Sequence, residues 1–378
     1  MEIKPELLSW AQIDITARCQ AMCLDCARNI KGVELNPEIG TSDTWDMPIE
    51  ILKKFLSLKM LSSLERIRFN GNFGDSLLHQ DFFNILKYVV KYAHKNLKVS
   101  ISTNGAMFDD DYYRELYSIL KPLRRHRVIF ALDGLEDTHH IYRRGTKFQD
   151  VIDHATAFIK AGGRADWQFI EFDHNKHQLE EAKQLARELK FEDFQHRHGS
   201  RNFSYIANAV SSGNPKDQNY GKETKKEPKR ELIVKNRQAY KEMEKKIHKA
   251  AGKTINEKLE EKDIDNVMNT VKITCSALKN KGLYLEYDGT VNMCCWLGDQ
   301  HKAKGENQRY EWNEKVVSKY GNKFNNLHYY TLNEILNHDY FVKYLPNSWG
   351  NTMQDKEYPR LETCPEMCGG WGDWNKQG

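Results

Sequence analysis

Residues 11–26, AQIDITARCQAMCLDC, place three cysteines directly behind a short apolar stretch that is typical of a β-strand. The cysteines Cys19, Cys23 and Cys26 have the spacing C-x3-C-x2-C. The chain has eight cysteines among 378 residues, which are too few for a disulfide scaffold in a protein of this size. Clustered cysteines in a reducing compartment more often bind metal or take part in chemistry. The stretch therefore predicts a strand that ends at a metal site.

Strand-like apolar runs alternate with amphipathic helical stretches from this point to about residue 198. The predicted strands are 11–16, 66–70, 97–103, 128–133, 167–172 and 191–196. The clearest predicted helix is 148–161, which keeps its apolar residues on one face and stops at Gly162-Gly163. Repeated strand–helix units require parallel strands with right-handed crossovers. Six such units fit a barrel and an open doubly wound sheet equally well.

Unusual residues follow four of the predicted strands. Cys19 follows the first strand, NGNFGD (70–75) ends the second, STNG (102–105) ends the third and LDG (132–134) ends the fourth. In both α/β architectures the chemistry gathers at the carboxyl ends of the strands. We therefore expect these four segments to meet at one site.

The second half of the chain differs in composition. Residues 199–270 are polar and lysine-rich, with predicted helices around 231–250 and 254–270. Residues 211–270 carry 15 Lys and Arg against 11 Asp and Glu, and the rest of the chain has 42 of each sign, so this segment holds the whole net charge of +4. From residue 271 short strands are predicted around 282–296, where Asp288-Gly289 is a strong hairpin signal. The chain closes with CPEMCGGWGDW (364–374).

Membrane insertion and secretion are not expected from this sequence. It has no run of eighteen apolar residues, and its N-terminus, MEIK, lacks the apolar core of a secretory signal. We therefore expect a soluble, cytoplasmic protein without a membrane partner.

The order of the motifs, one at each strand end, resembles the radical S-adenosylmethionine (SAM) superfamily over the first 200 residues. The resemblance implies a partial (β/α)6 TIM-like barrel. It also implies that Cys19, Cys23 and Cys26 hold a [4Fe-4S] cluster with one iron left open to chelate SAM. Without this context, three clustered cysteines also fit a structural zinc site.

The resemblance extends to the residues that bind SAM. In the family a glycine-rich stretch that ends in an acid follows the second strand, and further polar residues follow the next strands. Arg144 of YRRG (142–145) is the implied partner of the SAM carboxylate. The family usually has an aromatic residue before the third cysteine, where this chain has Asp25. The implied SAM-binding residues are Gly71, Asn72, Gly74, Asp75, Ser102, Asn104, Asp133 and Arg144.

The other five cysteines all lie after residue 270. The spacing of Cys275, Gly289 and Cys294 resembles the "twitch" or SPASM extension of radical SAM enzymes. It implies one auxiliary [4Fe-4S] cluster, held in a smaller α+β domain by Cys275, Cys294, Cys364 and Cys368. A four-cysteine zinc ribbon is the alternative.

Two further residues are candidate catalytic groups. Cys295 directly follows the second auxiliary cysteine, where some relatives carry an acid that acts as a base. Asp299 is the nearest acid further along the chain.

The resemblance implies three parts: a radical SAM core (1–200), a lysine-rich helical insertion or linker (201–270) and a twitch/SPASM-like domain (271–378). It implies a maturase-type oxidoreductase that cleaves SAM reductively to a 5′-deoxyadenosyl radical. The radical would then oxidise or cross-link an unactivated carbon, expected to belong to a peptide or protein side chain. A reducing electron donor such as flavodoxin or ferredoxin is also implied.

Three other functions fit parts of the sequence. The first is a radical SAM dehydrogenase of a small polar metabolite. An RNA-modifying enzyme could use residues 211–270 as its phosphate contact, although the interleaved acids there are more typical of a solvated helical face. A zinc-dependent binding module would make the strand-end motifs a coincidence.

Overall fold

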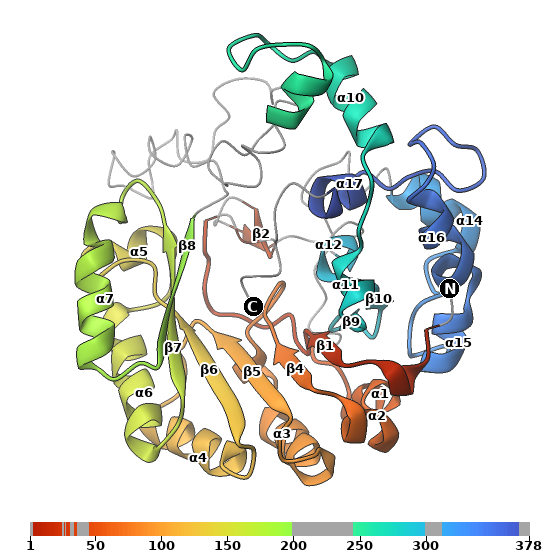
Figure 1. The fold of residues 1–378 in the computed structure, drawn as a ribbon. Coiled ribbons are helices and arrows are strands. Elements are labelled where there is room, and N and C mark those ends of the chain that lie inside the picture. The colour runs from red at the N-terminus through yellow and green to blue at the C-terminus, as the bar shows by residue number, and fades with distance from the viewer. Residues whose placement is uncertain are drawn as a thin grey trace.

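The computed structural model describes residues 3–24, 26, 28–30, 34–35, 45–198, 245–298 and 312–369. Its centre is a curved eight-stranded sheet with helices along its outer side (Figure 1). The strand order is β10-β9-β1-β4-β5-β6-β7-β8, and only the β9–β10 pair is antiparallel. The strands are β1 (Trp10–Ile13), β4 (Arg66–Phe69), β5 (Lys98–Thr103), β6 (Arg125–Ala131), β7 (Ala165–Glu171), β8 (Asp193–His198), β9 (Gly282–Leu285) and β10 (Val291–Asn292). A separate two-stranded ribbon pairs β2 (Asn29–Ile30) with β3 (Glu34–Leu35).

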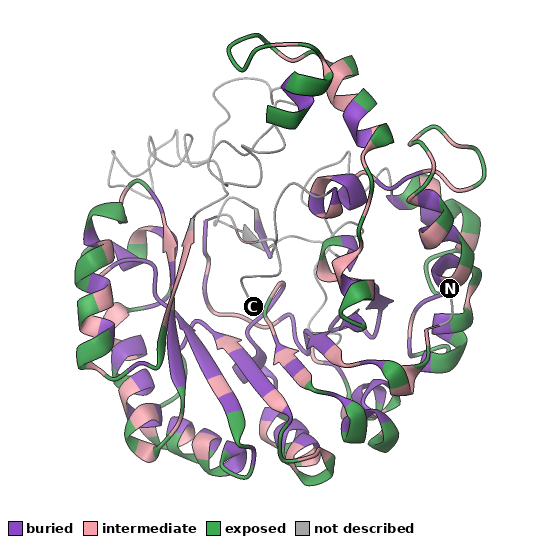
Figure 2. Cartoon of the chain, in the orientation of Figure 1, coloured by how far each residue is buried: buried purple, intermediate pink, exposed green. Residues whose placement is uncertain are grey.

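Helices connect the parallel strands in the first half of the chain. They are α1 (Ile49–Phe55), α2 (Leu58–Ser63), α3 (Phe82–Tyr92), α4 (Asp110–Leu120), α5 (His139–Tyr142), α6 (Phe148–Ala161) and α7 (Leu179–Glu188), with 3-10 turns at Pro5–Leu7, Ser76–Leu78 and Lys176–Gln178. Helix α6 has the predicted bounds, and it ends because Gly162 takes a φ of +111°, which favours glycine. Figure 2 shows that these helices expose their outer faces while the central strands are buried.

Short helices make up most of the second half. They are α10 (Glu261–Thr270), α11 (Ser276–Lys279), α12 (Cys295–Gly298), α14 (Ser318–Tyr320), α15 (Leu332–Asn337), α16 (Leu345–Ser348) and α17 (Thr363–Cys368), with π-helical segments at Asn313–Val317 and Tyr340–Tyr344. Residues 245–250 are also helical. Among the helices of the described ranges, none combines the length and the apolar character that a membrane span requires.

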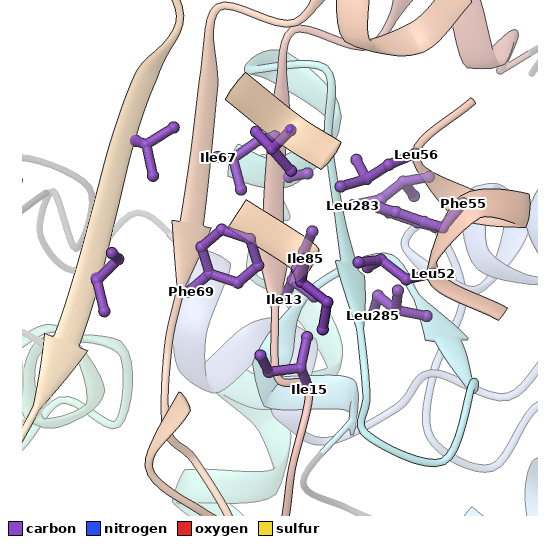
Figure 3. Packing of buried hydrophobic residues seen from close by; sticks show 14 of the residues in the cluster. Ile13, Ile15, Leu52, Phe55, Leu56, Ile67, Phe69, Ile85, Leu283 and Leu285 are labelled. Carbon is purple, nitrogen blue, oxygen red and sulfur yellow. The ribbon is translucent and has the colours of Figure 1, made fainter. Parts of the chain in front are cut away.

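The outer face of the sheet is apolar. Alternate residues of each strand point toward the helices, and Ile13, Ile67 and Leu285 of three neighbouring strands belong to one cluster with residues of helix α1 (Figure 3). Leu52 and Phe55 of α1 are fully buried in this cluster. This face forms the main hydrophobic core of the protein.

The inner face of the sheet is polar. Gln12 and Tyr284 lie at one register position on β1 and β9, and Arg68 and Ser100 continue the row on β4 and β5. Gln12, Tyr284 and Ser100 are buried, and Arg68 is partly exposed. Because these residues alternate with the apolar residues of the core, the sheet presents polar groups to its concave side.

The six predicted strands are confirmed, with bounds that shift by up to three residues. The predicted hairpin at Asp288-Gly289 is also confirmed, since β9 and β10 pair on either side of it. The structure adds that β9 pairs in parallel with β1 and so extends the sheet of the first half. Of the insertion predicted at 201–270, residues 201–244 lie outside the described residues. The division into three domains stays a prediction.

Candidate functional site

The loop behind β1 brings the three N-terminal cysteines together. Cys23 is buried, and Cys19 and Cys26 are partly exposed. All three belong to one small apolar cluster that includes Tyr142 and Phe172, whose rings lie 4.7 Å apart. The backbone N–H of Cys26 donates to the carbonyl of Cys23 at 3.2 Å, so the loop turns back on itself. The three thiols therefore belong to one apolar cluster.

The electrostatics of this loop suit a cationic ligand. Burial raises the pKa of the Cys19 thiol, and the charges of Asp75, Cys23 and Cys26 raise it further. Thiolates so placed need a positive partner, which the iron of a cluster supplies. Among the residues described, no group of three His, Cys, Asp or Glu side chains is gathered closely enough to hold a single metal ion. In a four-iron cluster each thiolate binds a different iron, which three thiols of one apolar cluster can do. The donor set fits such a cluster.

The glycine-rich loop after β4 packs directly on the cysteine loop. A Cβ atom at Gly74 would lie 2.2 Å from the carbonyl oxygen of Thr16, and one at Gly71 would lie 2.1 Å from the carbonyl oxygen of Gly74. The backbone N–H of Asp75 donates to the carbonyl of Arg18 at 2.7 Å. Only glycine permits this close approach of the two backbones.

Asp75 holds the loops after β4 and β5 together. Its Oδ2 accepts hydrogen bonds from the Thr103 hydroxyl at 2.9 Å and from the backbone and side-chain amides of Asn104, both at 2.7 Å. Its Oδ1 accepts one from the Leu77 N–H at 3.1 Å. Burial raises the pKa of this carboxyl, although all these hydrogen bonds favour its ionised form. Asp75 is thus a positioning residue with its acceptors already engaged.

Asn104 connects this network to the cysteine loop. Its side-chain amide lies 3.6 Å from the Cys19 sulfur, and its Oδ1 accepts a hydrogen bond from Gln20 at 2.7 Å. Donors of this kind tune a thiolate ligand and fix its orientation.

We expect Asp75→Ala to lower the free energy of unfolding by about 2–3 kcal/mol, because it leaves the buried Thr103 hydroxyl and the Asn104 amides without their acceptor. Chemical denaturation of the reconstituted protein measures this change. The matched control is Asp81→Ala, which removes an exposed carboxylate and should change stability by less than about 0.5 kcal/mol. Equal effects of the two substitutions would contradict the role given to Asp75.

Asn72, from the same glycine-rich loop, contacts the second half of the chain. Its backbone N–H donates to Asp14 Oδ2 at 3.0 Å, and its side-chain amide donates to the Tyr284 hydroxyl at 3.1 Å. The Tyr284 hydroxyl in turn donates to Asp14 Oδ2 at 3.0 Å. This triangle fixes β9 beside the strand ends of β1 and β4.

The predicted residues Asp133 and Arg144 lie in different surroundings. Asp133 is fully buried, and its carboxylate accepts from the Arg143 guanidinium at 2.6 Å and from the Ile170 N–H at 2.6 Å. Burial lowers the pKa of Arg143, but the charges of Asp133 and Cys23 outweigh it and raise the pKa overall. Arg144 packs on the cysteine loop, where its carbonyl accepts from the Met22 N–H at 2.8 Å.

The remaining predicted residues differ in position. Ser102 is partly exposed on the inner face of β5. Cys295 is the first residue of α12 and is partly exposed. Asp299 lies outside the described residues. The other predicted SAM-site residues follow strands β4, β5 and β6 at their carboxyl ends, and Arg144 comes after helix α5 and contacts the cysteine loop.

The four C-terminal cysteines also lie near one another. The backbone N–H of Thr274 donates to the Cys368 carbonyl at 2.9 Å, which joins the start of α11 to the end of α17. Burial raises the pKa of Cys275 to about 11, and the charge of Cys368 adds to this. Burial also raises the pKa of Cys294, with further contributions from Cys275 and Cys364. These thiols form a second candidate cluster site.

Sequence reasoning missed several residues of the first site. Arg143, which pairs with Asp133, was not distinguished from its neighbour Arg144. Tyr284 lies between Leu283 and Leu285, and strand alternation predicts that its side chain points to the face opposite those two leucines. This signal could have identified Tyr284 as a residue of the inner face. Asp14 carried a visible signal, a charged residue between two isoleucines.

Residues 13–186 match the family model described as the radical SAM superfamily. The match covers just under half of the 378 residues, and proteins of this superfamily use a [4Fe-4S] cluster and SAM. An Fe-coproporphyrin III synthase of Methanosarcina barkeri is 28% identical over 130 residues, which are 34% of this chain. The match spans only 28% of the length of that relative.

Two solved structures share the fold. SuiB of Streptococcus suis has a TM-score of 0.52 and 14% identity, covering 95% of this chain and 77% of SuiB. The anSMEcpe protein with bound AdoMet has a TM-score of 0.50 and 16% identity, covering 95% of this chain and 91% of that chain. At this identity the likeness shows the fold alone, and it confirms the predicted partial barrel.

Proposed function

We propose that this protein cleaves SAM reductively and oxidises or cross-links an unactivated carbon of a peptide or protein side chain. The observation that carries the proposal is the convergence of the Cys19, Cys23 and Cys26 thiols with the loops after β4, β5 and β6 inside a radical SAM domain. When bound, the cluster and SAM supply a 5′-deoxyadenosyl radical.

The residues of the chain position these groups and exclude water. The three thiolates would each bind one iron, and Asn104 would orient Cys19 by its 3.6 Å contact. Tyr142 and Phe172 pack with the cysteines in one apolar cluster, which would help to keep solvent away from a reactive radical. Arg144 would pair with the SAM carboxylate.

The second set of thiols supports an oxidative outcome. Removal of a hydrogen atom from the substrate leaves a radical, and forming a double bond or a cross-link from it requires the loss of one more electron and of one proton. Cys275, Cys294, Cys364 and Cys368 would hold an auxiliary cluster in a twitch- or SPASM-like arrangement that accepts this electron. A donor such as flavodoxin or ferredoxin would return electrons to the first cluster.

A peptide is the substrate class that we favour. SuiB, which shares the fold, is known in complex with its precursor peptide SuiA. A small metabolite is the second candidate, because the M. barkeri relative is named for a porphyrin product.

The experiment is to incubate the reduced, reconstituted protein with SAM and with short peptides encoded near its gene. We expect 5′-deoxyadenosine together with a peptide that has lost two hydrogens. If 5′-deoxyadenosine formed without any peptide product, the peptide proposal would fail.

A further inference from the structure

Arg68 occupies an unusual position in the middle of β4. Its neighbours Ile67 and Phe69 are fully buried in the outer core, as Figure 3 shows, so Arg68 points to the opposite, concave side of the sheet. Burial lowers the pKa of its guanidinium, and the charge of Arg66 lowers it further. Cys295 of α12 lies near enough for its charge to raise the pKa of the same guanidinium.

Within the part of the chain that the structure describes, the Arg68 guanidinium has no acidic partner. Among the described residues, no hydrogen bond or ion pair involves the Arg68 side chain. Arg127 on the inner face of β6, unlike Arg68, has two acidic partners. It donates to the fully buried Asp166 at 2.8 Å and to Glu192 at 3.1 Å. Arginine stays charged at any ordinary pH, so an unpaired guanidinium inside the sheet lowers stability.

The residues beside Arg68 are polar as well. Gln12 on β1 and Ser100 on β5 are its register partners on the two neighbouring strands, and both are 5% exposed. Within the described ranges, neither side chain is engaged in a hydrogen bond. Tyr284, the register partner of Gln12 on β9, differs because its hydroxyl is engaged: it donates to Asp14 Oδ2 at 3.0 Å and accepts from the Asn72 side-chain amide at 3.1 Å. The row of Gln12, Arg68 and Ser100 thus offers one positive charge and two neutral donors to the concave side.

We propose that Arg68, flanked by Gln12 and Ser100, binds a carboxylate group of the substrate on the concave face of the sheet. The inference rests on the proposed function in assigning the carboxylate to the substrate. Binding at this depth would hold the substrate between the strand-end loops of the radical SAM domain and the hairpin that carries Cys294 and Cys295.

A carboxylate matches this row better than a phosphate does. It carries one negative charge and accepts two parallel hydrogen bonds from a guanidinium. A phosphate group carries nearly two negative charges, so it would need a second cationic side chain beside Arg68. An acidic side chain or the C-terminus of a peptide supplies the required group, and so does a carboxylated metabolite.

The first arm of the test is stability without substrate. Arg68→Met removes an unpaired charge and keeps the apolar length of the side chain, so we expect the apparent Tm of the reconstituted protein to rise by about 2 °C or more. Arg127→Met leaves Asp166 buried without its cation, so we expect its Tm to fall.

The second arm uses acetate as the probe, compared with chloride at equal ionic strength. We expect acetate to raise the Tm of the wild-type protein and of Arg66→Met, whose guanidinium lies 5.8 Å from the Trp10 ring centroid. Arg68→Met should lose this shift.

A fall or no change in the Tm of Arg68→Met, or an acetate shift that persists in this variant, would overturn the proposal. A larger shift with phosphate than with acetate would overturn the choice of a carboxylate. Wild-type SAM cleavage, assayed in parallel, reports separately on the proposed function.

Discussion

Replacing Cys19, Cys23 or Cys26 with alanine should reduce the reductive cleavage of SAM to the level of a reaction without protein. Each thiol is one of three ligands in the same loop, and the loss of one leaves the cluster without a complete set of ligands. The measurement is 5′-deoxyadenosine formed in the presence of dithionite, together with the iron content of each variant.

The matched control for these variants is Met22→Ala in the same loop. Met22 contacts Arg144 through its backbone N–H, which the substitution retains, so this variant should keep its iron and its SAM cleavage. Cleavage at wild-type rate by any of the three cysteine variants would contradict the assignment of the first cluster.

Replacing Cys364 or Cys368 with alanine should abolish product formation while SAM cleavage continues at a reduced or similar rate. The reason is that these thiols lie with Cys275 and Cys294 in a separate site, on α17 and beside α11. The iron content should fall from about eight to about four atoms per chain. Iron analysis and mass spectrometry of the substrate report the two effects independently.

Normal substrate turnover by both C-terminal variants would limit the second site to a structural role. Thr363→Ser is a suitable control, because it changes a neighbouring residue of the same helix and retains the hydroxyl. It should leave both the iron content and the product unchanged.

The sheet was predictable because each strand carries its own signal. The runs at 66–70, 97–103 and 167–172 are short, apolar and bounded by polar turns, and the order of the strands follows from right-handed crossovers between consecutive units. The meeting of the four strand-end motifs then follows from parallel geometry. Helix α6 was predictable to the residue because a glycine pair ends it.

The joining of the two halves was not predictable, because it depends on contacts between residues far apart in sequence. The parallel pairing of β9 with β1 leaves no local signal in either strand. The hydrogen bond between Tyr284 and Asp14 spans 270 positions. Whether Arg143 or Arg144 pairs with Asp133 depends on the backbone conformation where α5 ends. Two adjacent arginines in the sequence do not reveal which of them faces Asp133.

Iron and acid-labile sulfide in protein reconstituted under anaerobic conditions test the central claim most directly. Two complete sets of cysteine ligands, Cys19, Cys23 and Cys26 in one and four C-terminal thiols in the other, predict about eight irons and about eight sulfides per chain, with the broad charge-transfer absorbance of [4Fe-4S] clusters. Stoichiometric zinc without sulfide or visible absorbance would contradict the account.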